Sequence, residues 1–168
     1  FVNGISTLDQ FAQDAGVAVI SGASTVPALS DAVVAAFASE FARIDQMKYG
    51  IAPGQGAERG LANTRAILGY VGRKLAPFKG IKSDVYGWQD IYRQAYPGLG
   101  QRWMANCDVP DLDLLPDRHN IEKIQFSAGL ELGLMHLGLW VTSHLVRQGI
   151  PLPLERMAPA LLSVSNWF

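Results

Sequence analysis

The first part of the chain combines helical and strand-like apolar patterns. Residues 7–15 are predicted to form a helix, because Ser6 and Asp9 have the spacing of a capping box and Gly16 provides a stop. Residues 17–21 then form an apolar run without alternation, bounded by glycines. Such a run is typical of a strand buried on both faces of a parallel sheet. The pattern therefore predicts an α/β unit at the start of the chain.

A second helix is predicted to begin at Ser24 or Thr25, with Pro27 in its first turn, where the missing N–H does no harm. Apolar residues four positions apart form the stripe of this helix: Leu29, Val33, Phe37 and Phe41. A lone buried strand between two helices needs neighbouring strands on both sides. We therefore expect the remaining strands of this sheet to come from sequence outside these residues or from another chain.

After residue 43 the apolar pattern changes to that of half-buried strands and amphipathic helices. Residues 46–51 alternate between polar and apolar side chains, which predicts a strand with one solvated face. Further predicted elements are a helix over residues 61–71 ended by Gly72, a hairpin over 74–88, strands over 101–107 and 122–128, and helices over 130–148 and 154–167. An acidic loop with Pro110 and Pro116 separates the last two strands. We expect residues 43–168 to be an α+β domain with a mixed or antiparallel sheet covered by helices.

Composition and charge limit the classes of partner. The chain has 168 residues, 49% of them hydrophobic, which is enough for a core and leaves apolar surface for a partner. Fourteen basic residues are scattered among 15 acidic ones, so we expect no nucleic-acid ligand. The single cysteine, Cys107, excludes an internal disulfide and favours a cytoplasmic location. The apolar residues 128–146 are interrupted by Glu131 and two histidines, so we expect a buried amphipathic helix and no membrane span.

Three segments of the sequence resemble the saccharopine dehydrogenase-like proteins. They are residues 21–30 (SGASTVPALS), residues 60–68 (GLANTRAIL) and residues 85–90 (VYGWQD). The resemblance points to a broad branch of that family and does not carry a substrate with it. It implies an N-terminal Rossmann domain that binds NAD(P) and an inserted α+β domain that contacts a small-molecule substrate and a second subunit. On this basis residues 1–42 are expected to be the C-terminal piece of a Rossmann-like domain, and residues 43–168 the substrate and dimerisation domain.

The resemblance also divides the expected cofactor site between this chain and other sequence. The strand, glycine-rich turn and helix that hold a pyrophosphate have no counterpart here, and the chain opens without a methionine or a signal-peptide pattern. We therefore expect an interior piece of a longer protein, with NAD or NADP bound by the full-length parent and no cofactor bound by this piece alone. Ser24, Thr25 and Pro27 are the predicted cofactor-binding residues, because ligands bind where a strand of an α/β sheet ends and a helix begins. Plain N-capping explains the two hydroxyls equally well.

Arg65, Tyr86 and Asp90 are the predicted substrate-binding residues. An arginine can bind a carboxylate through two hydrogen bonds, although a solvated helix face also accounts for Arg65. Tyr86 and Asp90 combine an amphipathic aromatic ring with a carboxylate after a turn, which suits a binding edge, an interface or simple packing. The glycines between residues 54 and 60 follow an alternating strand, so we do not expect a dinucleotide site there.

No catalytic residue or metal site can be assigned from the sequence. The three histidines lack a metal-ligand spacing, and Cys107 has no histidine near it in sequence. Two hypotheses follow. The chain is the substrate-side and dimerisation portion of an NAD(P)-dependent oxidoreductase, inactive in isolation and homodimeric. Alternatively, it is a non-catalytic dimerisation or scaffolding module that associates through a sheet face and the helix over residues 130–148.

Overall fold

The computed structural model describes residues 2–20, 22–54, 56–57 and 60–165. Within these residues the chain has six α-helices and a four-stranded sheet, which is the predicted α+β class. The chain divides into two units. The first consists of Phe1–Gln46 and Val109–Glu122, and the second of Met47–Asp108 and Lys123–Phe168. The boundary predicted from the sequence lies at residue 43, and that prediction includes residues 109–122 in the second part.

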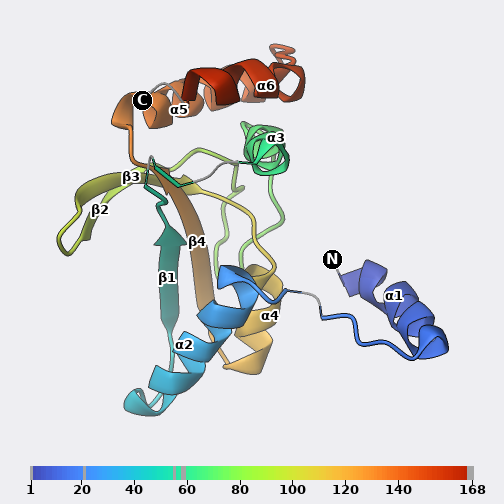
Figure 1. The fold of residues 1–168 in the computed structure, drawn as a ribbon. Helices are drawn as coiled ribbons and strands as arrows, with labels where there is room; N and C mark the ends of the chain where they lie inside the picture. The colour runs from blue at the N-terminus through green and yellow to red at the C-terminus, as the bar shows by residue number, and fades with distance from the viewer. Residues whose placement is uncertain (1, 21, 55, 58–59, 166–168) are drawn as a thin grey trace. The chain divides into compact units, whose positions relative to one another are not determined.

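The second unit is built on a mixed sheet with the strand order β1-β4-β3-β2. The strands are β1 (Gln46–Ile51), β2 (Tyr92–Tyr96), β3 (Gly100–Asn106) and β4 (Lys123–Leu130). β3 pairs antiparallel with both β2 and β4, whereas Figure 1 shows β1 running in the same direction as β4. β1, β3 and β4 confirm the three strands predicted over residues 46–51, 101–107 and 122–128. β2 was not predicted.

The register of β3 and β4 gives the sheet two different faces. Ala105 pairs with Ala128, and both contact the hydrophobic core of the unit. Met104 pairs with Gly129 on the opposite face. On that face the Lys48 ammonium lies 3.4 Å from the centre of the Tyr92 ring. The second face therefore carries Met104, Gly129 and the Lys48–Tyr92 contact.

The second unit has three helices: α3 (Leu61–Tyr70), α5 (Gly133–Arg147) and α6 (Leu154–Ser165). α5 packs against β3 and β4, and α3 packs against α6. They lie together at the upper end of the sheet in Figure 1. Their core consists of Leu68, Val71, Trp88, Ala105 and Ala158. Gly72 has a φ of +68° and ends α3 as predicted. α5 begins three residues later than predicted, because β4 continues through Leu130.

The predicted hairpin over residues 74–88 exists only as an irregular pairing. Lys74 and Tyr86 form an isolated antiparallel bridge, and the Leu75 amide donates to the Val85 carbonyl at 2.9 Å. The two segments therefore meet where the sequence predicts, but they form no regular strands.

The first unit contains α1 (Val2–Ala15), an irregular helical turn (Thr25–Leu29), α2 (Ser30–Phe37), a short 3-10 helix (Ala38–Glu40) and α4 (Asp111–Arg118). The predicted capping box is wrong, because α1 begins at Val2 and Ser6 lies inside it. Gly16 does end α1, with a φ of +64°. α4 was predicted to be a loop, although its two first-turn aspartates favour a helix N-terminus.

The strand predicted over residues 17–21 does not form in the described residues 17–20, and Ser21 lies outside the described residues. Ile20 is 80% exposed, so this run is not buried on two faces. The apolar stripe that begins at Leu29 is exposed as well. The Rossmann-like piece expected for residues 1–42 is therefore not confirmed.

The apolar residues 128–146 were predicted to form a buried amphipathic helix. They are divided between the end of β4 and most of α5. Among the described residues, no helix is both long enough and apolar enough to cross a membrane.

Candidate functional site

The predicted cofactor residues lie in an exposed turn that leads into α2. The Ser24 hydroxyl donates to the Val26 carbonyl at 2.8 Å, and the Leu29 amide donates to the Ser24 carbonyl at 3.2 Å. Pro27 follows a cis peptide bond. The Ser24 side chain thus holds the turn together, and it makes no N-capping hydrogen bond. The Thr25 side chain is exposed at the start of the turn.

A charged cluster that the sequence analysis missed lies at the start of α2. The carboxylate of Asp31 accepts from the His119 ring at 2.7 Å and pairs with the Arg118 guanidinium at 3.1 Å. Asp31 lies on α2, and Arg118 and His119 lie at the end of α4. Asp31 and His119 are 88 positions apart in the sequence. The cluster places the exposed cation of Arg118 and the largely buried His119 ring beside the first turn of α2.

The segment from Tyr86 to Asp90 is fixed by its backbone in the second unit. The Gly87 amide donates to the Arg73 carbonyl at 3.0 Å, and the Gly87 carbonyl accepts from the Gly72 amide at 3.1 Å. A Cβ atom on Gly87 would collide with the Tyr70 carbonyl oxygen, so only glycine fits at this close approach.

Two residues of this segment have left-handed backbone conformations that are unusual for side chains other than glycine. Trp88 has a φ of +62° and Asp90 a φ of +53°. The Trp88 indole is fully buried, and its N–H donates to the Ile67 carbonyl at 3.2 Å. Its backbone amide donates to the Asn106 carbonyl at 2.9 Å. Such conformations persist only where the surrounding contacts hold them in place.

Asn106 links the segment to the sheet. Its side-chain amide donates to the Asp90 carboxylate at 2.7 Å, and its side-chain oxygen accepts from Gln125 at 3.0 Å. Its backbone amide donates to the Gln89 carbonyl at 3.0 Å. Asn106 is buried at the end of β3, so the exposed Asp90 carboxylate is held by a rigid donor.

Arg147 links the same segment to α5. Its guanidinium donates to the Gln89 side-chain oxygen at 2.8 Å and lies 3.9 Å from the centre of the Tyr86 ring. A cation over an aromatic face is attracted by the negative face of the ring. Tyr86 and Asp90, both predicted to bind substrate, are therefore brought together in one segment with fixed orientations.

α5 carries two buried polar side chains on its inner side, close to Trp88. His136 and Ser143 are both fully buried, and the rings of His136 and Trp88 meet edge to face at 5.4 Å. Within the described residues neither His136 ring nitrogen has a hydrogen-bond partner. Burial lowers the pKa of His136 from 6.5 to about 4, so the ring is neutral near pH 7.

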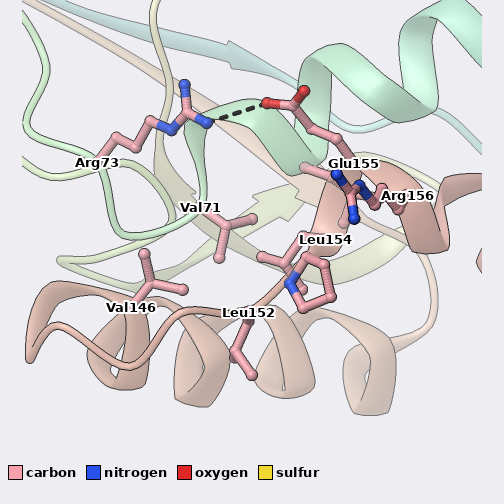
Figure 2. Close-up of a pocket in the computed structure, with 9 residues that line it drawn as sticks. Val71, Arg73, Val146, Leu152, Leu154, Glu155 and Arg156 are labelled. Carbon is pink, nitrogen blue, oxygen red and sulfur yellow. Dashed lines mark hydrogen bonds and ion pairs between the residues drawn. The ribbon is translucent and has the colours of Figure 1, made fainter.

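A cavity of about 270 Å³ adjoins Arg73, next to the backbone that holds Gly87. Its apolar lining comes from α3, α5 and the start of α6, and includes Val71, Val146 and Leu154. Figure 2 shows the Arg73 guanidinium and the Glu155 carboxylate facing each other at its edge, where they pair at 3.0 Å. Arg156 lies beside Glu155 in the same view. The cavity thus combines an apolar floor with a charged rim.

The other predicted residues lie apart from this arrangement. Arg65 is exposed on α3 and takes no part in the hydrogen bonds that hold residues 86–90. Burial raises the pKa of the Cys107 thiol to about 11, so it stays protonated near neutral pH and is unsuited to be a nucleophile. Gln55, Glu58 and Arg59 of the glycine-containing loop lie outside the described residues. Among the described residues no cluster of His, Cys, Asp and Glu could hold a metal ion.

Comparisons with protein-family models, with curated proteins and with solved structures find no match to this chain.

Proposed function

We propose that this chain is the substrate-side and dimerisation portion of a cytoplasmic, saccharopine dehydrogenase-like oxidoreductase that uses NAD or NADP. The observation that carries the proposal is the left-handed backbone at Trp88 and Asp90. For a bulky residue such as Trp88 this conformation costs on the order of 1–3 kcal/mol, whereas aspartate tolerates it more readily, and such strain is concentrated at binding and catalytic sites. Here it lies in a motif of the resemblance, and the neighbouring Gly87 amide bonds to the carbonyl of Arg73, which lines a cavity.

In this proposal the segment Tyr86–Asp90 forms a substrate-binding edge. The exposed Asp90 carboxylate accepts hydrogen bonds from the substrate, and the Asn106 amide keeps it oriented. The Tyr86 ring, held by Arg147, contacts the apolar part of the substrate. Arg65 is a second, more distant contact for a substrate carboxylate. A bound nicotinamide supplies the hydride chemistry, and the residues of this chain orient the substrate.

The turn at Ser24, Thr25 and Pro27 is the proposed cofactor contact in the first unit. Because the Ser24 hydroxyl already bonds inside the turn, the exposed Thr25 hydroxyl is the group that can meet a ligand. Arg118 pairs with Asp31 on the first turn of α2 and adds a cation that suits a phosphate group. The glycine-rich turn that holds a pyrophosphate must come from sequence outside these residues.

Thermal stabilisation by NAD and NADP tests the cofactor part of the proposal. We expect a rise in melting temperature for the full-length parent and none for residues 1–168 alone. Thr25→Val removes one hydroxyl and should weaken cofactor affinity about fivefold, whereas Thr7→Val on the exposed face of α1 should leave it unchanged. If neither form is stabilised by either nucleotide, the oxidoreductase proposal is wrong.

Substrate turnover by the full-length parent tests the binding edge. Asp90→Asn keeps the shape of the side chain and the left-handed backbone, which asparagine tolerates. Loss of the charge should lower kcat/KM about 10-fold to 100-fold. The matched control is Asp84→Asn, which removes a surface carboxylate that pairs with Lys74. Equal effects of the two variants would contradict a role for Asp90.

A non-catalytic dimerisation or scaffolding module is the second candidate function. The exposed apolar face of α5 favours it, because contiguous apolar surface on a soluble protein marks a contact with a partner. A stable dimer whose parent binds neither nucleotide would support this candidate over the first.

A further inference from the structure

The cavity beside Arg73 lies within the second unit and extends from its core to the surface. All of its lining residues belong to that unit, and they come from α3, the turn after it, α5 and the start of α6. Among them Val71 is 1% exposed, whereas Leu152 is 37% exposed. Most of the lining is apolar, and solvent reaches it from one side.

The size of the cavity suits a small ligand. Its volume is about 270 Å³. An apolar cavity of about 150 Å³ is known to hold one benzene molecule, so by proportion this cavity has room for on the order of ten non-hydrogen atoms. Apolar walls offer water few hydrogen bonds, and removal of apolar surface from water is favourable. A short apolar chain is therefore a better occupant than water.

The rim of the cavity carries an excess of positive charge. The Arg73 guanidinium pairs with the Glu155 carboxylate at 3.0 Å, so these two charges offset each other. Figure 2 shows Arg156 beside this pair. The Arg156 side chain is exposed and makes no hydrogen bond or ion pair with another residue that the structure describes. The charge that is left to meet a ligand at this rim is therefore a cation.

A carboxylate is the head group that fits this rim best. The planar guanidinium of an arginine donates two parallel hydrogen bonds to the two oxygens of a carboxylate. An ammonium group would be repelled by Arg156 and would have to compete with Arg73 for Glu155. An alcohol would make the apolar contacts but would lack the charge-assisted hydrogen bonds.

We propose that this cavity binds a short amphipathic carboxylate, with an aliphatic chain of about six to ten carbons on the apolar lining and the carboxylate on Arg156. None of the substrate-binding residues proposed above lines the cavity, so this site is separate from the proposed function and does not depend on it. Because the lining comes from α3, α5 and α6, a bound chain contacts all three helices.

An NMR titration of the chain with octanoate tests the site. We expect saturable shifts of the amide signals of Val71, Arg73 and Leu154, with a dissociation constant on the order of 1 mM for a ligand of this size. 1-Octanol should bind at the same place about fivefold more weakly, and octylammonium at least tenfold more weakly. The absence of saturable shifts at these amides, or octylammonium binding as tight as that of octanoate, would overturn the proposal.

The Arg156→Gln variant tests the assignment of the head group. It should weaken octanoate binding about tenfold and leave 1-octanol binding unchanged, because only the carboxylate loses its partner. The matched control is Arg93→Gln, which removes an exposed arginine from β2 and should change neither affinity. Arg156 is exposed, so we expect the spectrum of the variant to be unchanged away from the cavity. Equal effects of the two substitutions on octanoate binding would contradict the role of Arg156.

Two further substitutions give effects that a nonspecific apolar surface would not show. Glu155→Gln frees the Arg73 cation and should strengthen octanoate binding about threefold. Leu152→Ser removes part of the apolar lining and should weaken octanoate and 1-octanol alike, about fivefold. Glu155→Gln that weakens octanoate binding, or Leu152→Ser that leaves both ligands unaffected, would overturn the site.

Discussion

The two units of the chain use their apolar residues differently. The second unit buries large side chains such as Trp88, Met104 and Phe126. In the first unit, Ala12 is the only buried apolar residue among the described side chains from residue 7 to residue 46, and its other buried side chains, such as Leu115 and Ile121, come from residues 109–122. Phe37 there is 59% exposed, although it belongs to a regular apolar stripe. The periodicity of apolar residues therefore shows which side of a helix can be buried. It does not show whether the surface that covers this side lies in the same chain.

Truncation of one phenylalanine in each unit should give the largest contrast. Phe126→Ala should lower the free energy of unfolding by about 4 kcal/mol, because it leaves a cavity in a closed core. Phe37→Ala should lower it by less than about 0.5 kcal/mol, because the ring is exposed. Urea denaturation measures both. A cost of more than about 2 kcal/mol for Phe37→Ala would show that the Phe37 ring is buried in the folded chain, which contradicts its exposure here.

Two glycines with similar φ values, one in each unit, extend the comparison of the two units. Gly72 and Gly16 have φ values of +68° and +64°. A Cβ atom on Gly72 would collide with the Ser143 carbonyl oxygen and with Val146, whereas one on Gly16 would have nothing within 4 Å. We expect Gly72→Ala to cost about 3 kcal/mol or more, and Gly16→Ala about 1 kcal/mol for the backbone alone. Similar melting temperatures for the two variants would contradict the tight packing of the turn after α3 against α5.

The buried His136 should make the second unit sensitive to acid. Its pKa is about 4 in the folded chain and 6.5 in the unfolded one, so the unfolded chain binds more protons between these values. Stability should therefore fall as the pH drops from about 6.5 through about 4, by at most about 3 kcal/mol. His136→Leu should remove this part of the pH dependence of the unfolding free energy. His144→Gln, on the same helix, is the control and should keep it.

The smallest effect is expected at the rim of the cavity in Figure 2. Arg73 and Glu155 pair at 3.0 Å, but both side chains are more than half exposed. Solvent and salt screen such a pair, so Glu155→Gln should change the unfolding free energy by less than about 1 kcal/mol. The difference from the unchanged chain should disappear in 1 M NaCl, where the screening length is about 3 Å. A larger effect that survives high salt would mean that Glu155 has a further role in the packing of α6.

Much of the second unit could be predicted from the sequence, because its strands and helices alternate between core and solvent. β2 was missed because Arg93, Gln94 and Ala95 are all exposed and give no alternation. α4 was missed because Pro110 and Pro116 were interpreted as loop residues. In the first unit the apolar run over residues 17–21 was assigned to a buried strand, but a run of this kind shows only that the residues are apolar.

Two residues of the candidate site could be chosen from the sequence, where Tyr86 and Asp90 suit a binding edge, an interface or simple packing. Their role in binding stays a prediction, and the structure gives both residues fixed orientations. Their supports, Asn106 and Arg147, could not be predicted, because they depend on the register of β3 and on the rotation of α5. The pairing of Asp31 with His119 joins residues 88 positions apart, and no local pattern could indicate it.

Hydrogen exchange of the whole chain tests most directly the claim that the second unit holds the segment Tyr86–Asp90 in place. The informative amides are those of Trp88 and Asn106, which bond to carbonyls across this segment. We predict that both exchange as slowly as the amides of β3 and β4, near the rate of global unfolding, while α1 and α2 exchange early. Fast exchange at Trp88 and Asn106, or equal protection of α2, would contradict the account.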